Sequence, residues 1–269
     1  YPAALVQTAA ATAPNTPALR GSAAPATEGI PPRWTVLTIT WINSLGSGIL
    51  WSGVPFVTEG TFGFTKTQNL LLALAESVIY VVVALGSGPV LRRLGAATGL
   101  TPRGWLVGIF AIQLAAAFAA LAGATGLVLA ACALSGCGAA LWPVMESYMS
   151  AGQHGHDMRR SIGWFNITWM SATAASLLLM APISAAGHAD WAMLTMVPVS
   201  AASIALLRWM PARTAAHAPG AAHRHIAPQY AYLLRATRFV VPTSYVFISA
   251  LGPILPFMLR ALALPDGWM

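Results

Sequence analysis

Long apolar stretches alternate with short polar ones along most of the chain, and each stretch approaches the roughly 20 residues that a helix needs to cross a bilayer. The first 33 residues are rich in Ala, Pro and Thr and show no sustained periodicity. Seven apolar segments follow, at residues 34–57, 67–91, 104–122, 126–150, 161–186, 191–209 and 239–259. This pattern predicts an all-α, polytopic transmembrane helical bundle, preceded by a disordered Ala/Pro-rich tail over residues 1–33.

Composition supports this class of protein. Hydrophobic residues make up 57% of the chain and charged residues 8%, against about a quarter charged in ordinary soluble domains. Seven apolar segments with so little charge between them leave no polar exterior for a water-soluble protein. The net charge of +7 is also spread too thinly for a nucleic-acid surface. We therefore expect a lipid bilayer as a partner and no nucleic acid.

Basic residues fall mainly on one side of the predicted spans. The chain holds 14 Lys and Arg residues, and all but Lys66 and Arg260 lie in the tail or in the loops after the second, fourth and sixth segments. By the positive-inside rule these loops face the cytoplasm. We therefore expect a multi-pass protein of the cytoplasmic (inner) membrane with its N-terminus in the cytoplasm.

The longest predicted loop divides the chain into two parts. Residues 34–209 hold six apolar segments, residues 210–238 form a basic cytoplasmic linker, and residues 239–269 hold the seventh segment. The chain begins with Tyr1 and ends with Met269, shortly after that segment. We therefore expect a six-helix N-terminal bundle followed by the start of a second bundle, the missing C-terminal half of the same protein being its partner.

Polar and small side chains recur at helical spacing in four of the segments. Such a stripe marks a face that lies against protein or water, because lipid-facing surface is uniformly apolar. The first, second, fourth and fifth segments each carry one, whereas the third offers mainly Gln113 and the sixth has few polar residues. Tight helix packing also explains a stripe of Ser, Thr and Ala, and we favour it for those residue types. The pattern predicts that segments one, two, four and five face inward.

Two carboxylates lie inside the apolar segments. An ionisable group at membrane depth costs roughly 2.5–3.5 kcal/mol on insertion scales, so it tends to be retained for a use. Glu76 has no basic residue within a few turns of its own helix. It is either a proton-coupling site that faces a cavity or a structural carboxyl bonded to neighbouring helices. Glu146 lies near the cytoplasmic end of its segment, at the height of Arg92 and Arg93, and for it we favour an ion pair over contact with a substrate.

Several chemistries have no signature in the sequence. The metalloprotease motif HExxH, the hydrolase motif GxSxG and the Walker lysine motif are all missing. None of the six histidines falls in the middle of an apolar segment, and Cys132 and Cys137 lie five residues apart on different faces of one predicted helix. We therefore expect no enzymatic activity, no catalytic residue, no cofactor and no metal site.

Residues 88–97, read as GPVLRRLGAA, resemble a signature of the major facilitator superfamily of transporters. The signature lies between the second and third helices of those proteins and runs Gly-x-x-x-Asp-Arg-x-Gly-Arg-Arg. Gly88, Arg93 and Gly95 match it, whereas Arg92 stands at the aspartate position and two alanines replace the final arginines. The spacing of the match agrees with the position of this loop in the predicted topology.

Two further stretches carry the same resemblance. WPVME at residues 142–146 and GWFNITW at residues 163–169 look like stretches of a bacterial branch of the superfamily. The resemblance implies a twelve-helix protein of two six-helix bundles, with a site between them near the membrane midplane and alternating access by rocking of the bundles. Because Arg92 replaces the usual aspartate, the gating ion pair expected here is Glu146 with Arg92 or Arg93.

The resemblance predicts a secondary active transporter that moves a small solute by alternating access, with protons as an optional coupling ion at Glu76. On this interpretation the cavity-lining side chains are Asn43, Ser47, Trp51, Tyr80, Trp142, Asn166, Trp169 and Tyr245. Trp and Tyr suit stacking on a sugar-like or aromatic ligand, and they serve equally well in packing. Two other classes stay open: a seven-helix receptor or sensor, and a membrane-embedded enzyme that acts on lipids.

Overall fold

The structure is a computed structural model that describes residues 29–185, 191–215, 232–233, 236, 240 and 251–262. In these residues the chain is helical and contains no strand. The helices are α1 (Arg33–Phe62), α2 (Lys66–Thr98), α3 (Pro102–Ala119) with η1 (Ala120–Ala122), α4 (Ala124–Ser150), α5 (Gly155–Ala185), α6 (Trp191–Leu194), α7 (Met196–Leu206) with η2 (Leu207–Trp209), η4 (Gly252–Ile254) and α9 (Leu255–Ala261). The predicted tail, most of the linker and most of the seventh segment lie outside the described residues.

Five of the described helices are long and apolar enough to cross a membrane. They are Lys66–Thr98, Pro102–Ala122, Ala124–Ser150, Gly155–Met180 and Trp191–Trp209. The prediction of a polytopic helical membrane protein is confirmed at this level. The first predicted segment also forms a helix, α1, but α1 is not among the five. Ser, Thr, Gly and Asn residues make it less apolar, and about half of its residues are buried against other helices.

Local sequence signals explain where the helices on both sides of the tight turns begin and end. At the start of α2 the Thr65 hydroxyl accepts from the Gln68 main-chain N–H while the Gln68 side chain accepts from that of Thr65, which forms a capping box. At α3 the Thr101 hydroxyl accepts from the Gly104 main-chain N–H, just before a proline in the first turn. Gly63 and Gly99 end α1 and α2 with φ values of 66° and 73°, a conformation that glycine adopts without strain.

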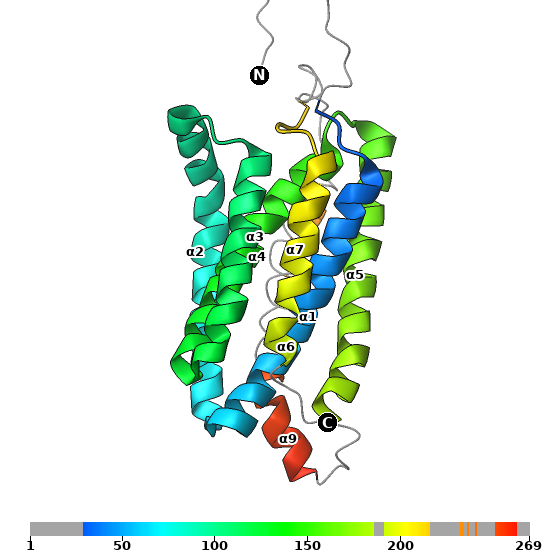
Figure 1. The fold of residues 1–269 in the computed structure, drawn as a ribbon. Coiled ribbons are helices and arrows are strands. Elements are labelled where there is room, and N and C mark those ends of the chain that lie inside the picture. Colours follow the sequence, from blue (N-terminus) through cyan, green and yellow to red (C-terminus); the bar gives the residue numbers. More distant parts are fainter. Residues whose placement is uncertain are drawn as a thin grey trace, which may run out of the picture.

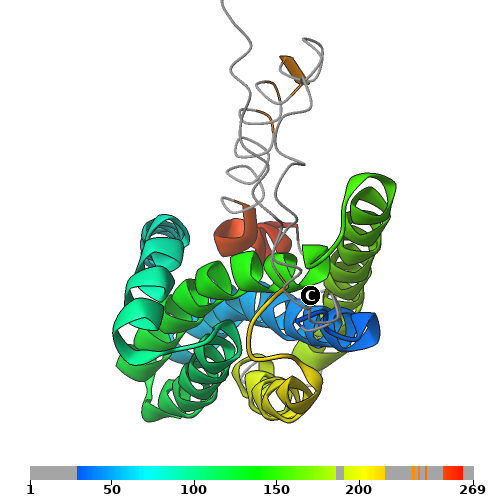
Figure 2. The same cartoon turned by 90° about the horizontal axis from the view of Figure 1, so that it is seen from above.

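Successive helices run in alternating directions, and α1 and α4 cross the centre of the bundle in opposite senses (Figures 1 and 2). Helix α1 packs on α5 and on the α6–α7 pair, while α4 packs on α2 and α3, and the two central helices contact each other. Exchanging the first three helices with the next three therefore reproduces the same pattern of neighbours. This is the packing symmetry of an inverted three-helix repeat.

The polar face predicted to point inward does so in α2, where Asn69, Glu76 and Ser87 are buried and most leucines and valines are exposed. In α5, by contrast, Ser176 is buried and Asn166 is exposed. In α4 56% of the most apolar window is buried, against 17% in both α2 and α5 and 39% in the third span. Helices α2 and α5 are therefore the most exposed spans of this bundle, although their sequences carry polar stripes. A polar stripe indicates that a helix face is not in contact with lipid. It does not indicate which neighbouring helix covers that face.

The arginines of the described residues gather at one end of the bundle, which we call the basic end. It contains the start of α1, the α2–α3 and α4–α5 turns and the segment after η2 (Figure 1). Hydrogen bonds join these parts: the Arg103 guanidinium donates to the Met210 main-chain oxygen at 3.0 Å, and the Tyr148 hydroxyl donates to that of Pro211 at 2.9 Å. The described cations at the opposite end, the Glu59 end, are Lys66 and Arg260.

Candidate functional site

A small cavity of about 50 Å³ lies among the helices, and we call it the central cavity. Four helices and α7 contribute to its wall. The lining residues are Asn43, Ser47, Leu50, Trp51, Tyr80, Gln113, Leu134, Ser135, Gly138, Leu141, Trp142 and Met196. None of these side chains carries a formal charge. The volume suits a few water molecules and is far below the roughly 300–1,000 Å³ of ordinary ligand pockets.

The central cavity lies halfway along the helices that line it. Ser47 is the middle residue of α1, and Tyr80 and Gly138 lie within two residues of the midpoints of α2 and α4. A helix that spans a bilayer has its midpoint near the centre of the hydrocarbon region. The cavity therefore brings polar side chains together at the depth where lipid tolerates them least.

Asn43 ties α1 to α7 beside the cavity. Its side chain is buried, with the residue 1% exposed, and its amide nitrogen donates to the Ile39 main-chain oxygen at 3.0 Å and to the Ser203 hydroxyl at 2.7 Å. Its amide oxygen has no hydrogen-bond partner among the described residues. Because the nitrogen faces a carbonyl, the amide cannot be reversed without losing that bond. Asn43 therefore offers one unused acceptor at this site.

A hydrogen bond between α2 and α4 fixes the opposite wall. The Ser135 hydroxyl donates to the main-chain oxygen of Glu76 at 2.8 Å, and Tyr80 lies one turn further along α2, where it lines the cavity. A Cβ on Gly138 would lie 4.0 Å from the rings of both Tyr80 and Trp142. A Cβ at this position would thus be in ordinary van der Waals contact with both rings, so Gly138 marks where the two aromatic side chains meet the cavity.

Glu76 lies beside the cavity wall without being part of the lining. The residue is 7% exposed. Within the described part of the chain its carboxyl group has neither a hydrogen bond nor an ion pair, and only its main-chain oxygen is engaged. An ionised carboxylate in this position would have no counter-charge, so the neutral acid is favoured by the surroundings. The structural alternative, a carboxyl bonded to neighbouring helices, has no support among the described contacts.

Two of the eight predicted cavity residues do not line the central cavity, and a third lies outside the described residues. Asn166 and Trp169 lie on α5, where the Trp169 indole donates to the Asn166 side-chain oxygen at 3.2 Å and Asn166 is exposed. Tyr245 lies outside the described residues. The other five, which include both cavity tryptophans, are brought together.

The expected gating pair is not formed in this structure. Glu146, Arg92 and Arg93 are all exposed, and none of them belongs to an ion pair between described residues. A role for these charges in gating stays a prediction.

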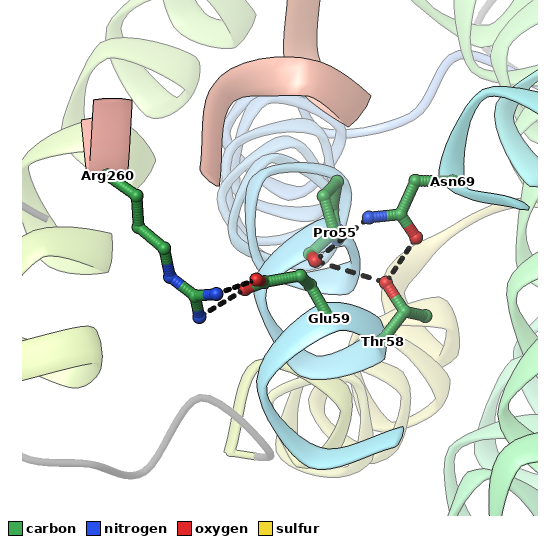
Figure 3. Close-up of polar contacts among 5 residues, drawn as sticks. All are labelled: Pro55, Thr58, Glu59, Asn69 and Arg260. Carbon is green, nitrogen blue, oxygen red and sulfur yellow. Dashed lines mark hydrogen bonds and ion pairs between the residues drawn. The ribbon is translucent and has the colours of Figure 1, made fainter. Parts of the chain in front are cut away.

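Sequence reasoning missed two features of the site. Gln113 lines the cavity although its helix was expected to be peripheral, and its side-chain oxygen lies 3.5 Å from the Ser200 hydroxyl. It was recognisable as the one strongly polar side chain of the third segment. The second feature is an ion pair at the Glu59 end between Glu59 and Arg260 (Figure 3). No local pattern could have found it, because 201 positions separate the two residues.

The described residues contain no group of three or more His, Cys, Asp or Glu side chains placed to hold a metal ion. Cys132 and Cys137 are both free thiols. A scan against models of known protein families and a search of curated proteins found no match for the chain. The interpretation of the central cavity therefore rests on its own geometry and chemistry.

Proposed function

We propose that the chain belongs to a secondary active transporter of the major facilitator type, which moves a small solute through the cytoplasmic membrane by alternating access. The observation that carries the proposal is the central cavity at the midpoints of its helices, lined by uncharged polar and aromatic side chains. Transporters place their substrate sites near the bilayer midplane, between structural repeats. The inverted packing of the first and second three-helix units supports the same assignment.

The orientation that we propose follows from the basic end. Eight arginines of the described residues lie there, at Arg33, Arg92, Arg93, Arg103, Arg159, Arg160, Arg208 and Arg213. Cytoplasmic loops carry such an excess of basic residues. The N-terminus is then cytoplasmic and the Glu59 end faces the opposite side.

The size and shape of the central cavity also agree with half of a transport site. A solute larger than a few waters does not fit within about 50 Å³, so the remaining wall has to come from a second bundle. Helix α5 supplies exposed polar surface at Asn166 for such a bundle to cover, whereas the polar stripe of α2 is buried within this bundle. This arrangement explains why Asn166, a strongly polar residue within a span, is exposed in the bundle described.

Glu76 is the residue that we propose for proton coupling. Its carboxyl is buried beside the cavity with no cation within the described contacts. Protonation removes the charge of the Glu76 carboxylate, so α2 can then pack against an apolar surface. Release of the proton requires that water reach Glu76 through the cavity. Intramembrane carboxyls with these surroundings serve as proton relays in transporters.

The test is solute-driven proton movement in sealed vesicles that contain the full-length protein and a trapped pH indicator. A panel of uncharged small solutes is added outside, and the internal pH is recorded. We expect at least one solute to move protons and Glu76→Gln to abolish that movement. Asp157→Asn is the matched control, because Asp157 is an exposed carboxylate at the basic end, and we expect it to behave as wild type.

Other outcomes would select the rival functions. Solute binding without movement across the membrane favours a receptor or sensor, and chemical conversion of a lipid or solute favours an enzyme. Solute movement that Glu76→Gln leaves unchanged at every pH would retain transport and remove the proton from it.

A further inference from the structure

Glu59 on α1 and Arg260 on α9 form a two-point ion pair at the Glu59 end of the bundle (Figure 3). The Arg260 Nη2 atom donates to Glu59 Oε2 at 2.8 Å, and Nη1 contacts Oε1. The Glu59 side chain is 8% exposed and that of Arg260 is 61% exposed. A buried carboxylate held by a planar guanidinium in this geometry is stronger than a typical surface pair, while the exposed arginine can still leave for water.

The carboxylate is presented from a stiff part of the bundle. Thr58 Oγ1 lies 2.6 Å from the Asn69 side-chain oxygen, and the Asn69 amide donates to the Pro55 main-chain oxygen at 3.2 Å. These contacts join the end of α1 to the start of α2 one residue before Glu59 (Figure 3). The α1–α2 hairpin is therefore one rigid partner of the ion pair, and α9 is the other.

The ion pair and the central cavity share helix α1. Trp51, Pro55 and Glu59 follow one another at intervals of four residues, so they lie along one side of the helix, and Glu59 is roughly 12 Å beyond Trp51 along its axis. Trp51 lines the cavity. Pro55 has no N–H to donate to the Trp51 carbonyl, so one helical hydrogen bond is missing between the cavity and the ion pair.

The segment that carries Arg260 covers this end of the bundle. Helix η4 packs against α2 and α1, and α9 packs against α1 (Figure 1). Apart from the ion pair, the described part of this segment buries chiefly the rings of Pro253 and Pro256. Lys66 is the remaining described charge near the start of α2, and it is exposed without a partner among the described contacts.

We propose that the Glu59–Arg260 ion pair is a reversible latch that closes the Glu59 end of the route to the central cavity. When the pair parts, α9 leaves α1 and this end opens to solvent. At the basic end, Glu146, Arg92 and Arg93 form no ion pair between described residues. The inference rests on the proposed transport by alternating access, in which one end closes while the other is open.

The experiment measures access to the cavity from the Glu59 end and needs no transported solute. The full-length protein carries Cys132→Ala and Cys137→Ala to remove its described thiols, and Ser47→Cys supplies a reporter in the cavity wall. Sealed vesicles of both orientations are treated with a membrane-impermeant maleimide, and the labelling rate is recorded. The variants are Glu59→Gln, Arg260→Gln, their combination, and the swap Glu59→Arg/Arg260→Glu. Lys66→Gln is the control for loss of one charge at the same end.

We expect each single variant to raise labelling from the Glu59 end at least fivefold and the double variant to label no faster than the singles. The swap should return the rate toward wild type, and Lys66→Gln should match wild type. Labelling of both single variants at the wild-type rate overturns the latch, as do effects that add in the double variant. If the Gln variants do not insert, Glu59→Asp replaces them, because it keeps the charge with a shorter reach. An intermediate rate then supports the latch and a wild-type rate overturns it.

These outcomes separate the latch from the transport proposal. Unchanged labelling in a protein that still moves solute removes the latch alone. Faster labelling in a protein that moves no solute removes transport alone.

Discussion

The hydroxyl of Ser135 on α4 donates a hydrogen bond to the main-chain oxygen of Glu76 on α2, at 2.8 Å. This bond fixes the height of α2 against α4, and so it sets where the Glu76 carboxyl and the Tyr80 ring stand beside the cavity. Side-chain bonds of this kind between membrane helices are worth about 0.6 kcal/mol on average and up to about 1.7. The bond therefore adds little to the free energy of unfolding, and its main effect is to position the residues of the cavity wall.

Removing the Ser135 hydrogen bond should lower the stability of the bundle slightly. We expect Ser135→Ala to lower the free energy of unfolding in mixed micelles by about 0.5–1.5 kcal/mol, because the Glu76 carbonyl loses its partner. Ser147→Ala is the matched control, since Ser147 donates only to Val144 within α4, and its effect should be within about 0.5 kcal/mol. Equal losses in the two variants would show that the α2–α4 bond has no special role.

The Asn43–Ser203 bond should couple α1 to α7. A double-mutant cycle with Asn43→Ala, Ser203→Ala and the pair measures the coupling, and we expect about 0.6–1.7 kcal/mol. Ser203 also donates to the Val199 main-chain oxygen at 2.7 Å, so Ser203→Ala alone should be the milder change. A coupling energy near zero would contradict the placement of the Asn43 amide against α7.

The helical class of the protein was predictable because the length of an apolar segment can be read directly from consecutive residues. Each described span occupies nearly the residues that the pattern predicts, and the two ends of the bundle follow from the arginine distribution. Five cavity residues were also predictable, because polar stripes on α1, α2 and α4 converge in the middle of the bundle. In these cases the sequence pattern and the packing depend on the same helix geometry.

The remaining site features depend on contacts between distant elements. Asn166 and Trp169 satisfy the same stripe rule as the cavity residues, yet it is the later part of the α5 stripe, at Ser176, that packs on α1, and Asn166 is left exposed. The Glu59–Arg260 pair joins segments 201 residues apart. Helical spacing cannot distinguish a face that packs on a neighbour from one that awaits a further bundle, because both avoid lipid for the same reason.

Close approach of α1 to α5 should make Gly48 intolerant of a side chain. A Cβ at this position would collide with Ser176 of α5, so we expect Gly48→Val to cost about 1–3 kcal/mol of stability through overpacking. Gly108→Val is the control, because nothing lies within 4 Å of a Cβ there. Ser176→Gly in the Gly48→Val background should recover part of the loss. Failure of that rescue would place the strain elsewhere. Thermal unfolding in detergent measures the stability of the two single variants and of the Gly48→Val/Ser176→Gly pair.

The Trp34–Trp209 pair should hold the start of α1 at the basic end. The two rings meet edge to face with centroids 5.3 Å apart, and the Arg208 guanidinium lies 3.7 Å from the centre of the Trp209 ring. We expect Trp34→Ala to cost about 0.5–1.5 kcal/mol beyond its loss of buried area. Trp164→Ala is the control, because Trp164 is equally exposed, at 50% against 51%. Equal losses of stability would mean that the ring contact contributes nothing.

The uncharged lining of the central cavity predicts a preference for neutral solutes. An ion would have to leave water for a wall that offers dipoles and aromatic rings without a counter-charge, and this desolvation is unfavourable. If the proposed transport function holds and the Trp142 ring stacks on the solute, we expect Trp142→Phe to keep most of the affinity and Trp142→Ala to lose about tenfold, or about 1.4 kcal/mol. Equilibrium binding to the purified full-length protein measures both, with Trp164→Ala as the control outside the cavity. Ser47→Asp should shift the preference toward a cationic analogue of the same solute. Tight binding of an anion by the wild-type protein would contradict the prediction and would require a cation from the remaining wall of the site.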